Sequence, residues 1–206
     1  TSFSVIDSYE MFFRDKVTDI KGFSGLKIAG AGINMRYLTG TDSTPVIGSM
    51  VNYYNQLKAG AIDGAMLWTE AAVAFKLVEG APYMLKANIG TANSKAITIN
   101  RDVYNKLPEE VRKTIVAVSA DYRDYTAKAA LAEAGDAVAN FKKAGGQVID
   151  MSQEARQHWA DTMPNIAKEW AAELDGKGKP GGEMLTGWMD QMRAAKQPIL
   201  RQWDKE

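Results

Sequence analysis

Four positions with chemical capacity lie at or just after the ends of two short apolar runs of the sequence. Gly30 lies near the end of the run 26–31 and Arg36 follows that run, while Trp68 ends the run 61–68 and Glu70 follows it. A glycine lets the backbone approach a ligand closely, and a guanidinium pairs with a carboxylate through two parallel hydrogen bonds. An indole can form the wall of a small-molecule pocket, and a carboxylate accepts hydrogen bonds from ligand hydroxyl or amine groups.

Each of these positions also has a plainer interpretation. Gly30-Ala31-Gly32 can be a tight turn after a strand, and Arg36 can be a solvated surface arginine. Trp68 can belong to the core, and Glu70 can be a carboxylate that complements the start of a helix. Whether these residues bind a ligand or have the plainer roles depends on the elements that position them.

Those elements form a βαβ unit. The apolar runs 26–31 and 61–68 are set off by glycines and predict strands. Between them, after a turn at Thr44–Pro45, residues 49–59 carry apolar side chains at helical spacing. The ends of parallel strands and the loops that leave them line a crevice in which ligands usually bind.

The same segment resembles a known family. The motifs are D-I-K-G at residues 19–22, G-L-K-I at residues 25–28 and Y-x-x-L-K-x-G-A-I-D-G at residues 54–64. In this order they are similar to the signature of the periplasmic solute receptors of TRAP transporters, the DctP-like family. Residues 97–100 and 104–112 resemble the family's crossing strand and the start of its long helix. The resemblance extends from about Asp15 to about Ile149.

The resemblance implies an α/β fold: a periplasmic-binding-protein-like lobe with a mixed sheet, a long lobe-spanning helix and a helical C-terminal region. It divides the chain into a lead-in from the N-terminal lobe (1–25), the C-terminal ligand-binding lobe (26–97), a crossing strand with the long helix that ties the lobes (98–150), and C-terminal helices that pack on the lobes (151–206). Receptors of this family carry a lobe segment ahead of D-I-K-G, so the chain is expected to be N-terminally incomplete.

The family places a carboxylate-binding arginine directly after G-L-K-I, and here that position is Ala29. Arg36 is the nearest replacement. The resemblance also implies ligand contacts just before the crossing strand, near Thr91 and Asn93, although these residues equally suit a turn. With Trp68 and Glu70, the candidate ligand-binding set is Ala29, Gly30, Arg36, Trp68, Glu70, Thr91 and Asn93.

Composition excludes several functions. The chain has 206 residues, 25 basic and 25 acidic side chains, no cysteine and a single histidine, His158. The charge balance gives no support for nucleic-acid binding, and no disulfide or thiol nucleophile can form. A transition-metal site is improbable with so few nitrogen and sulfur ligands. No apolar run is long enough to cross a membrane, and no cofactor is expected.

The sequence therefore predicts a periplasmic, non-enzymatic solute receptor that binds an organic acid in an inter-lobe cleft and delivers it to TRAP transporter membrane subunits. Aromatic residues near the cleft and the absence of arginine at position 29 favour a bulky or aromatic carboxylate. One alternative is a fragment of a nucleotide-dependent α/β enzyme with a phosphate loop at Gly30-Ala31-Gly32, although Met35 stands where the third glycine of that motif belongs. Another is a helical interaction scaffold.

The remaining elements are predicted from periodicity. Strands are expected at residues 83–87, 96–100 and 147–150, the second covered on both faces. A long helix from Pro108 to Gly145 should carry an apolar stripe that includes Val111, Val118 and Tyr125. Ser152 should cap a helix that continues to about Leu174, and residues 175–182 should form a loop. A last helix should extend from Glu183 to about Trp203, with Pro198 kinking or ending it.

Overall fold

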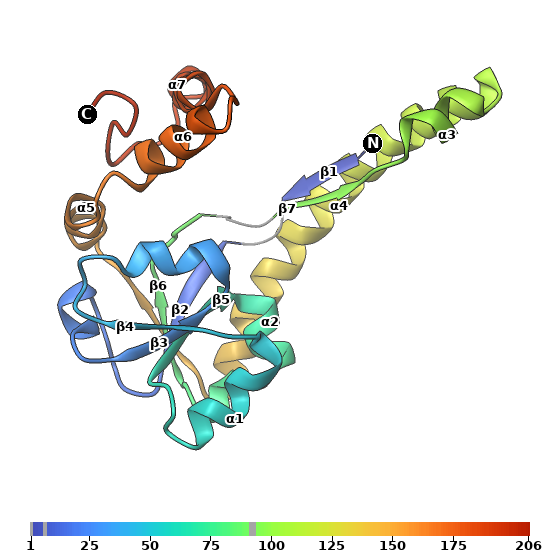
Figure 1. Ribbon diagram of the computed structural model, residues 1–206. Coiled ribbons are helices and arrows are strands. Elements are labelled where there is room, and N and C mark those ends of the chain that lie inside the picture. Colours follow the sequence, from blue (N-terminus) through green and yellow to red (C-terminus); the bar gives the residue numbers. More distant parts are fainter. Residues whose placement is uncertain (1, 6–7, 91–93) are drawn as a thin grey trace.

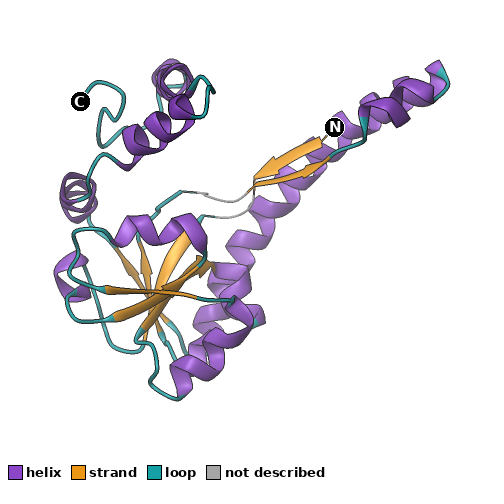
Figure 2. Cartoon of the chain, in the orientation of Figure 1, coloured by secondary structure: helices purple, strands orange, loops and turns teal. Residues whose placement is uncertain are grey.

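The computed structural model describes residues 2–5, 8–90 and 94–206, and it contains a lobe with a central sheet and an arm that extends from it (Figures 1 and 2). The arm consists of one long helix, α4, with a short helix and a two-stranded ribbon beside it. The C-terminal helices α6 and α7 lie at another side of the lobe. The mixed α/β fold predicted from the sequence is confirmed.

Among the described residues, six strands form the central sheet in the order β4-β3-β5-β2-β6-β8. Their bounds are β2 Tyr9–Phe13, β3 Lys27–Gly30, β4 Thr44–Ile47, β5 Gly64–Trp68, β6 Tyr83–Lys86 and β8 Gln147–Asp150. Strand β2 is antiparallel to both of its neighbours, whereas the pairs β3–β4, β3–β5 and β6–β8 are parallel. Five strands therefore point the same way, and their carboxyl ends lie at one edge of the sheet.

Strand β2 separates two hydrophobic cores. Its side chains alternate between the faces of the sheet, so that Tyr9, Met11 and Phe13 enter the first core and Phe12 enters the second. All five of its residues are buried. The high apolar content of this segment is explained by its position between β5 and β6, in the same sheet as residues 27–30 and 64–68.

Different helices cover the two faces. The first core is closed by the 3₁₀ helices η1 (Ile20–Phe23) and η2 (Gly32–Leu38) and by α5 (Gln153–Thr162). The second core is closed by α1 (Tyr53–Lys58), by α2 (Thr69–Ala74) and by the C-terminal end of α4. The lobe is thus a three-layer sandwich. Short 3₁₀ turns, η3 (Met50–Asn52) and η4 (Leu77–Glu79), flank α1 and α2.

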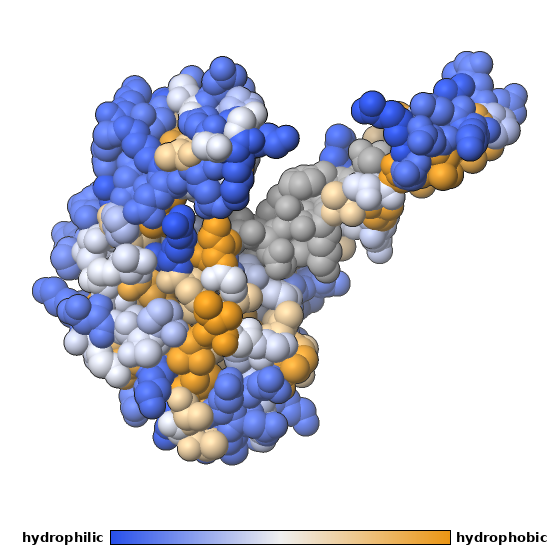
Figure 3. All heavy atoms as spheres, viewed as in Figure 1, coloured by the Kyte–Doolittle hydropathy of each residue, from blue (hydrophilic) through white to orange (hydrophobic). Residues whose placement is uncertain are grey.

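Helix α4 (Glu109–Lys143) is continuous for 35 residues and ends where the sequence predicted, with Gly145 in the left-handed conformation. Of the described residues of α4, Ala137 and Phe141 are buried. The predicted stripe is not covered in this chain, because Val111, Val118, Tyr122 and Tyr125 are exposed. Figure 3 shows apolar atoms along this arm.

The ribbon beside α4 pairs β1 (Ser2–Val5) with β7 (Ser94–Ile97) in antiparallel fashion, and α3 (Arg101–Lys106) follows. The expectation that residues 96–100 are covered on both faces is wrong for this chain, since all five are exposed. The periodicity of these residues reports the presence of an apolar surface, but not the element that covers it.

Prolines explain three differences from the predicted elements. Pro45 lies in β4 instead of a turn; β4 is the edge strand, whose outer side needs no N–H donor. Pro164 divides the helix predicted over 152–174 into α5 and α6 (Ile166–Gly176). The last helix, α7 (Gly181–Ala194), ends before Pro198, as predicted for that proline, and does not extend to Trp203; Lys196 is left-handed ahead of Pro198.

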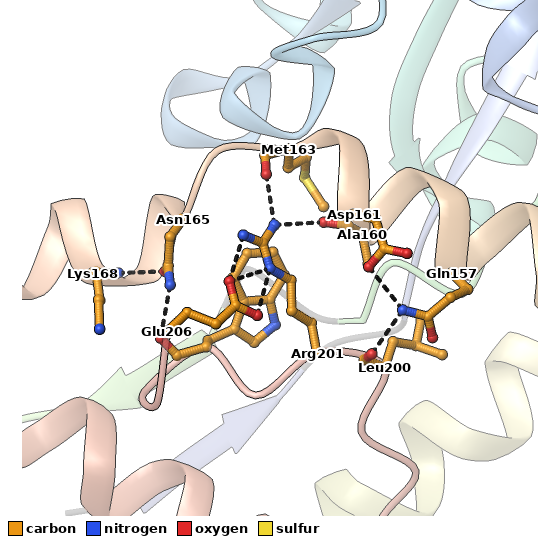
Figure 4. A network of polar contacts seen from close by, with 10 residues as sticks. Gln157, Ala160, Asp161, Met163, Asn165, Lys168, Leu200, Arg201 and Glu206 are labelled. Carbon is orange, nitrogen blue, oxygen red and sulfur yellow. Dashed lines mark hydrogen bonds and ion pairs between the residues drawn. The ribbon is translucent and has the colours of Figure 1, made fainter.

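The segment after α7, residues 195–206, is fastened to α5 by polar contacts (Figure 4). The Arg201 guanidinium donates to the carbonyl oxygens of Ala160 (2.7 Å) and Met163 (2.6 Å) and pairs with Glu206. Gln157 donates to the carbonyl of Leu200 at 2.9 Å. These bonds hold the C-terminal segment against the end of α5.

Candidate functional site

The carboxyl-terminal edge of the parallel strands is closed by backbone contacts. The Gly48 N–H, after β4, donates to the Gly30 carbonyl at 3.2 Å, and the Tyr53 hydroxyl donates to the Gly48 carbonyl at 3.1 Å. Exposed apolar residues flank this edge at Ile33, Ile47 and Val51. Figure 3 shows apolar atoms on one face of the lobe. The loops at this edge are hydrogen-bonded to one another, and part of the surface of the edge is apolar.

An aromatic pair lies at the centre of the edge. Trp68 ends β5 and stands opposite Tyr9, the first residue of β2. The ring centroids are 5.6 Å apart with the planes inclined at 58°, a tilted geometry typical of favourable aromatic pairs. Trp68 is half-buried and packs against both cores, so it is a core residue with one part left at the surface.

The segment after β6 is tied to the segment before β2. The Tyr9 N–H donates to the Gly90 carbonyl at 3.0 Å, and the Gly90 N–H donates to the Ser8 hydroxyl at 3.2 Å. Asn88, in the left-handed conformation, donates its N–H to the buried carboxylate of Glu10 at 3.0 Å. The two segments that leave the lobe toward the ribbon are therefore held side by side at this edge.

Arg36 makes an ion pair with Glu169 of α6. The distance from Arg36 Nη2 to Glu169 Oε2 is 3.4 Å, and the two side chains are 40% and 50% exposed. Exposed pairs of this kind contribute about 0–1 kcal/mol. Arg36 can therefore exchange Glu169 for another carboxylate at small cost.

The remaining candidate positions differ in their burial and in their place in the fold. Ala29 is fully buried in the second core, so its side chain faces the helices and not the strand edge. Gly30 is covered by Met35, whose methyl carbon would lie 2.0 Å from a Cβ at that position. Glu70 is in the first turn of α2. Thr91 and Asn93 lie outside the described residues.

The structure thus places Gly30, Trp68 and Glu70 at one edge, as the βαβ pattern predicted, while Arg36 is directed to α6. Sequence reasoning did not identify Tyr9, Ser8 and Asn88, which frame the same edge. The apolar content of residues 9–13 indicated packing, but nothing in it identified Trp68 as the partner of Tyr9.

Two tyrosine hydroxyls of the lobe have raised pKa values. Burial raises the pKa of the Tyr37 hydroxyl, which follows Arg36 in η2, and the hydrogen bond to Glu79 raises the pKa of Tyr54 on the far side of α1. Within the described residues no group of three or more His, Cys, Asp or Glu side chains could hold a metal ion. In the same part of the chain, no helix has both the length and the apolar character needed to cross a membrane.

Comparison with known proteins identifies the family. Residues 13–174 match the model of the bacterial extracellular solute-binding proteins, family 7, DctP. The chain belongs to this family. The match includes the whole central sheet apart from most of β2, and it also includes α4, α5 and most of α6, so the resemblance seen in the sequence motifs is confirmed.

Relatives share the fold at low identity. A solute-binding protein of Albidiferax ferrireducens is 25% identical over 167 residues, which are 79% of this chain and 49% of that protein. A TRAP periplasmic solute-binding protein from Desulfovibrio salexigens is 21% identical with a TM-score of 0.80, over 90% of this chain and 58% of the other. One from Bordetella bronchiseptica, with bound (R)- and (S)-mandelate, is 18% identical with a TM-score of 0.76, over 94% and 62%. The chain spans about half the length of the curated relative it matches.

Proposed function

We propose that residues 1–206 supply one lobe and the lobe-connecting helix of a TRAP solute receptor that closes on an organic acid. The observation that carries the proposal is the strand edge described above. Five parallel strands end together there, beside an aromatic pair and two chain segments that lead to the ribbon. Crevices at such edges are the usual ligand sites of α/β folds.

The domain division follows from this proposal. The predicted bounds change where the sheet requires it, because β2 and β8 belong to the sheet of the lobe and β7 does not. Residues 8–90 together with β8 form the ligand-binding lobe, α4 ties it to a second lobe, 151–206 pack against it, and β1 leads in from the second lobe, which we place outside this chain. The exposed stripe of α4 and the open edges of the β1–β7 ribbon support a covering element of this kind, because monomeric proteins rarely expose long apolar surfaces.

The proposed ligand site contains Gly30, Trp68 and Glu70 at the strand edge, Arg36 beside it, and Thr91 and Asn93 in the segment before β7. Ala29 contributes backbone only. The ligand carboxylate would displace Glu169 from Arg36, and an aromatic or bulky body would rest on Trp68. The mandelate-bound relative supports an aromatic acid as the class to test first.

Closure works by differential affinity. A ligand that contacts both lobes binds the closed state more tightly and shifts the population toward it. In this account the closed receptor acts in the periplasm, passes its ligand to the transporter's membrane subunits, and catalyses no reaction.

The nucleotide-enzyme alternative lacks support. A phosphate loop needs an α-helix whose first N–H groups point at the ligand, whereas Gly30-Ala31-Gly32 leads into the 3₁₀ helix η2, with Met35 folded over Gly30. The family match likewise indicates a binding protein.

The experiment is a thermal-shift screen of organic acids on a polypeptide that contains residues 1–206 together with the second lobe. We expect at least one acid to raise Tm by several degrees, and W68A and R36Q to reduce that shift. R14Q is the matched control, because Arg14 follows the other end of β2, at the opposite edge of the sheet. A screen in which nucleotides raise Tm and no acid does would refute the proposal.

A further inference from the structure

A hollow in the chain lies between α5, α6, α7 and the C-terminal segment, and it adjoins the strand edge at Tyr37 and residues 87–89. Its volume is about 330 Å³, at the small end of the range of ligand pockets. Most of its wall is apolar and polarisable, with Trp159, Trp188, Trp203, Met163, Met189 and Met192. We call it the C-terminal groove.

Arg156 is the single charged side chain among the described residues that line this groove. Its Nε is buried and donates no hydrogen bond within the described part of the chain. A buried donor without a partner costs free energy, and a guanidinium next to apolar walls has its strongest partner in a carboxylate. Arg201, on the adjoining segment, has its own partners in Glu206 and two carbonyls, so of these two arginines only Arg156 has a buried nitrogen without a partner among the described residues.

The walls of the groove are fixed by hydrogen bonds. The Trp159 indole N–H donates to the Tyr37 carbonyl at 2.7 Å, which joins α5 to the lobe. Asn165 donates to the Trp203 carbonyl at 2.9 Å, and Arg201 and Gln157 hold the segment between (Figure 4). A hollow with walls held in this way is available to a ligand without rebuilding of the chain.

We infer that the C-terminal groove binds a small amphipathic organic anion, with its carboxylate on Arg156 and its apolar body against the tryptophan and methionine side chains. A positive charge on an otherwise uncharged wall selects an anion over a cation. Unbranched thioethers adapt to ligands of different shape, so the selectivity is for this chemical class. Arg156 lies on α5, and the strand-edge residues Arg36 and Trp68 are not among the residues that line the groove.

The test is isothermal titration calorimetry of the 206-residue chain with 4-phenylbutyrate, and with neutral 4-phenylbutanamide as the uncharged counterpart. We expect saturable binding of the acid and binding of the amide that is weaker by about tenfold or more, the worth of a charge-assisted hydrogen bond. R156Q should weaken acid binding by the same factor and leave amide binding unchanged.

R112Q is the matched control, because Arg112 also has a buried Nε without a partner but lies on the arm in α4. It should leave binding unchanged. A167W, which places an indole at the groove wall, should abolish binding of both compounds while the Tm of the chain is retained. If R156Q unfolds, A167W is the variant that tests whether the compounds bind in the groove. Equal affinity for acid and amide, equal loss in R112Q and R156Q, no saturable binding, or unchanged binding in a folded A167W would each overturn the inference.

Discussion

Phe141 is the residue through which the long helix is anchored to the lobe. Its side chain is fully buried in the second core and meets the ring of Phe12 edge-on, with centroids 5.4 Å apart and planes inclined at 67°. In α4 it shares this burial with Ala137. F141A should therefore remove most of the apolar contact that fixes the helix.

The expected cost follows from burial. Replacing a fully buried phenylalanine with alanine costs about 3–5 kcal/mol, since both transfer and cavity terms apply. For a chain of this size each kcal/mol lowers Tm by about 2–4 °C, so F141A should lower Tm by about 6–20 °C. Thermal unfolding followed by far-UV circular dichroism measures this shift, and urea unfolding checks it independently.

Tyr125, on the same helix and 70% exposed, provides the control. Y125A should change the Tm of the 206-residue chain by no more than about 2 °C, since surface substitutions usually stay within about 0.5 kcal/mol. When the second lobe is present, Y125A should become destabilising. Equal loss in Y125A and F141A in the 206-residue chain, or a cost of F141A below about 1 kcal/mol, would refute this reasoning.

Three further predictions concern the C-terminal region. G181A should destabilise by about 1–3 kcal/mol in urea unfolding, because a Cβ there would lie 2.1 Å from the Ala171 carbonyl oxygen, whereas G187A, with open space around it, should be neutral or stabilise by up to about 1 kcal/mol. Arg193 lowers the pKa of the Asp204 carboxyl. The stability that this pair contributes is therefore present above the unfolded pKa of about 3.9 and is lost as pH falls through the lower folded value. Trp203 fluorescence should report the release of the C-terminal segment at low pH, and D204N should abolish this acid transition. W159F should cost about 1–3 kcal/mol by leaving a carbonyl of η2 without its donor, measured by thermal unfolding, and an unchanged Tm would contradict this.

Local signals predicted much of the fold. Strands β3, β5, β6 and β8 are apolar runs set off by glycine or proline, and α4 has Pro108 before it and Gly145 after it. These elements depend on residues near one another in the chain, so the sequence carries their signal directly.

The differences arise where distant segments decide the outcome. Pro45 is tolerated because β4 has no outer neighbour, a fact that only the completed sheet contains. The stripe of α4 predicted a buried face, but the surface that would cover it is not among the described residues.

The candidate site divides in the same way. The βαβ pattern placed Gly30, Trp68 and Glu70 at one strand edge, because that placement follows from local strand direction. The Tyr9–Trp68 pair and the Arg36–Glu169 pair join residues 59 and 133 positions apart, and no local pattern specifies such pairs. Ala29 faces the second core because β3 alternates there, so the position where the family resemblance placed an arginine has no side chain at the ligand edge.

The central claim is that this chain belongs to a receptor that closes on an organic acid at the strand edge. Native mass spectrometry of gently purified protein that contains both lobes tests it most directly, because a ligand enclosed by two lobes is retained through purification. The account predicts a bound species whose mass is that of an organic acid and which W68A reduces while R14Q does not. A bound nucleotide, or an acid retained equally by W68A, would contradict the account.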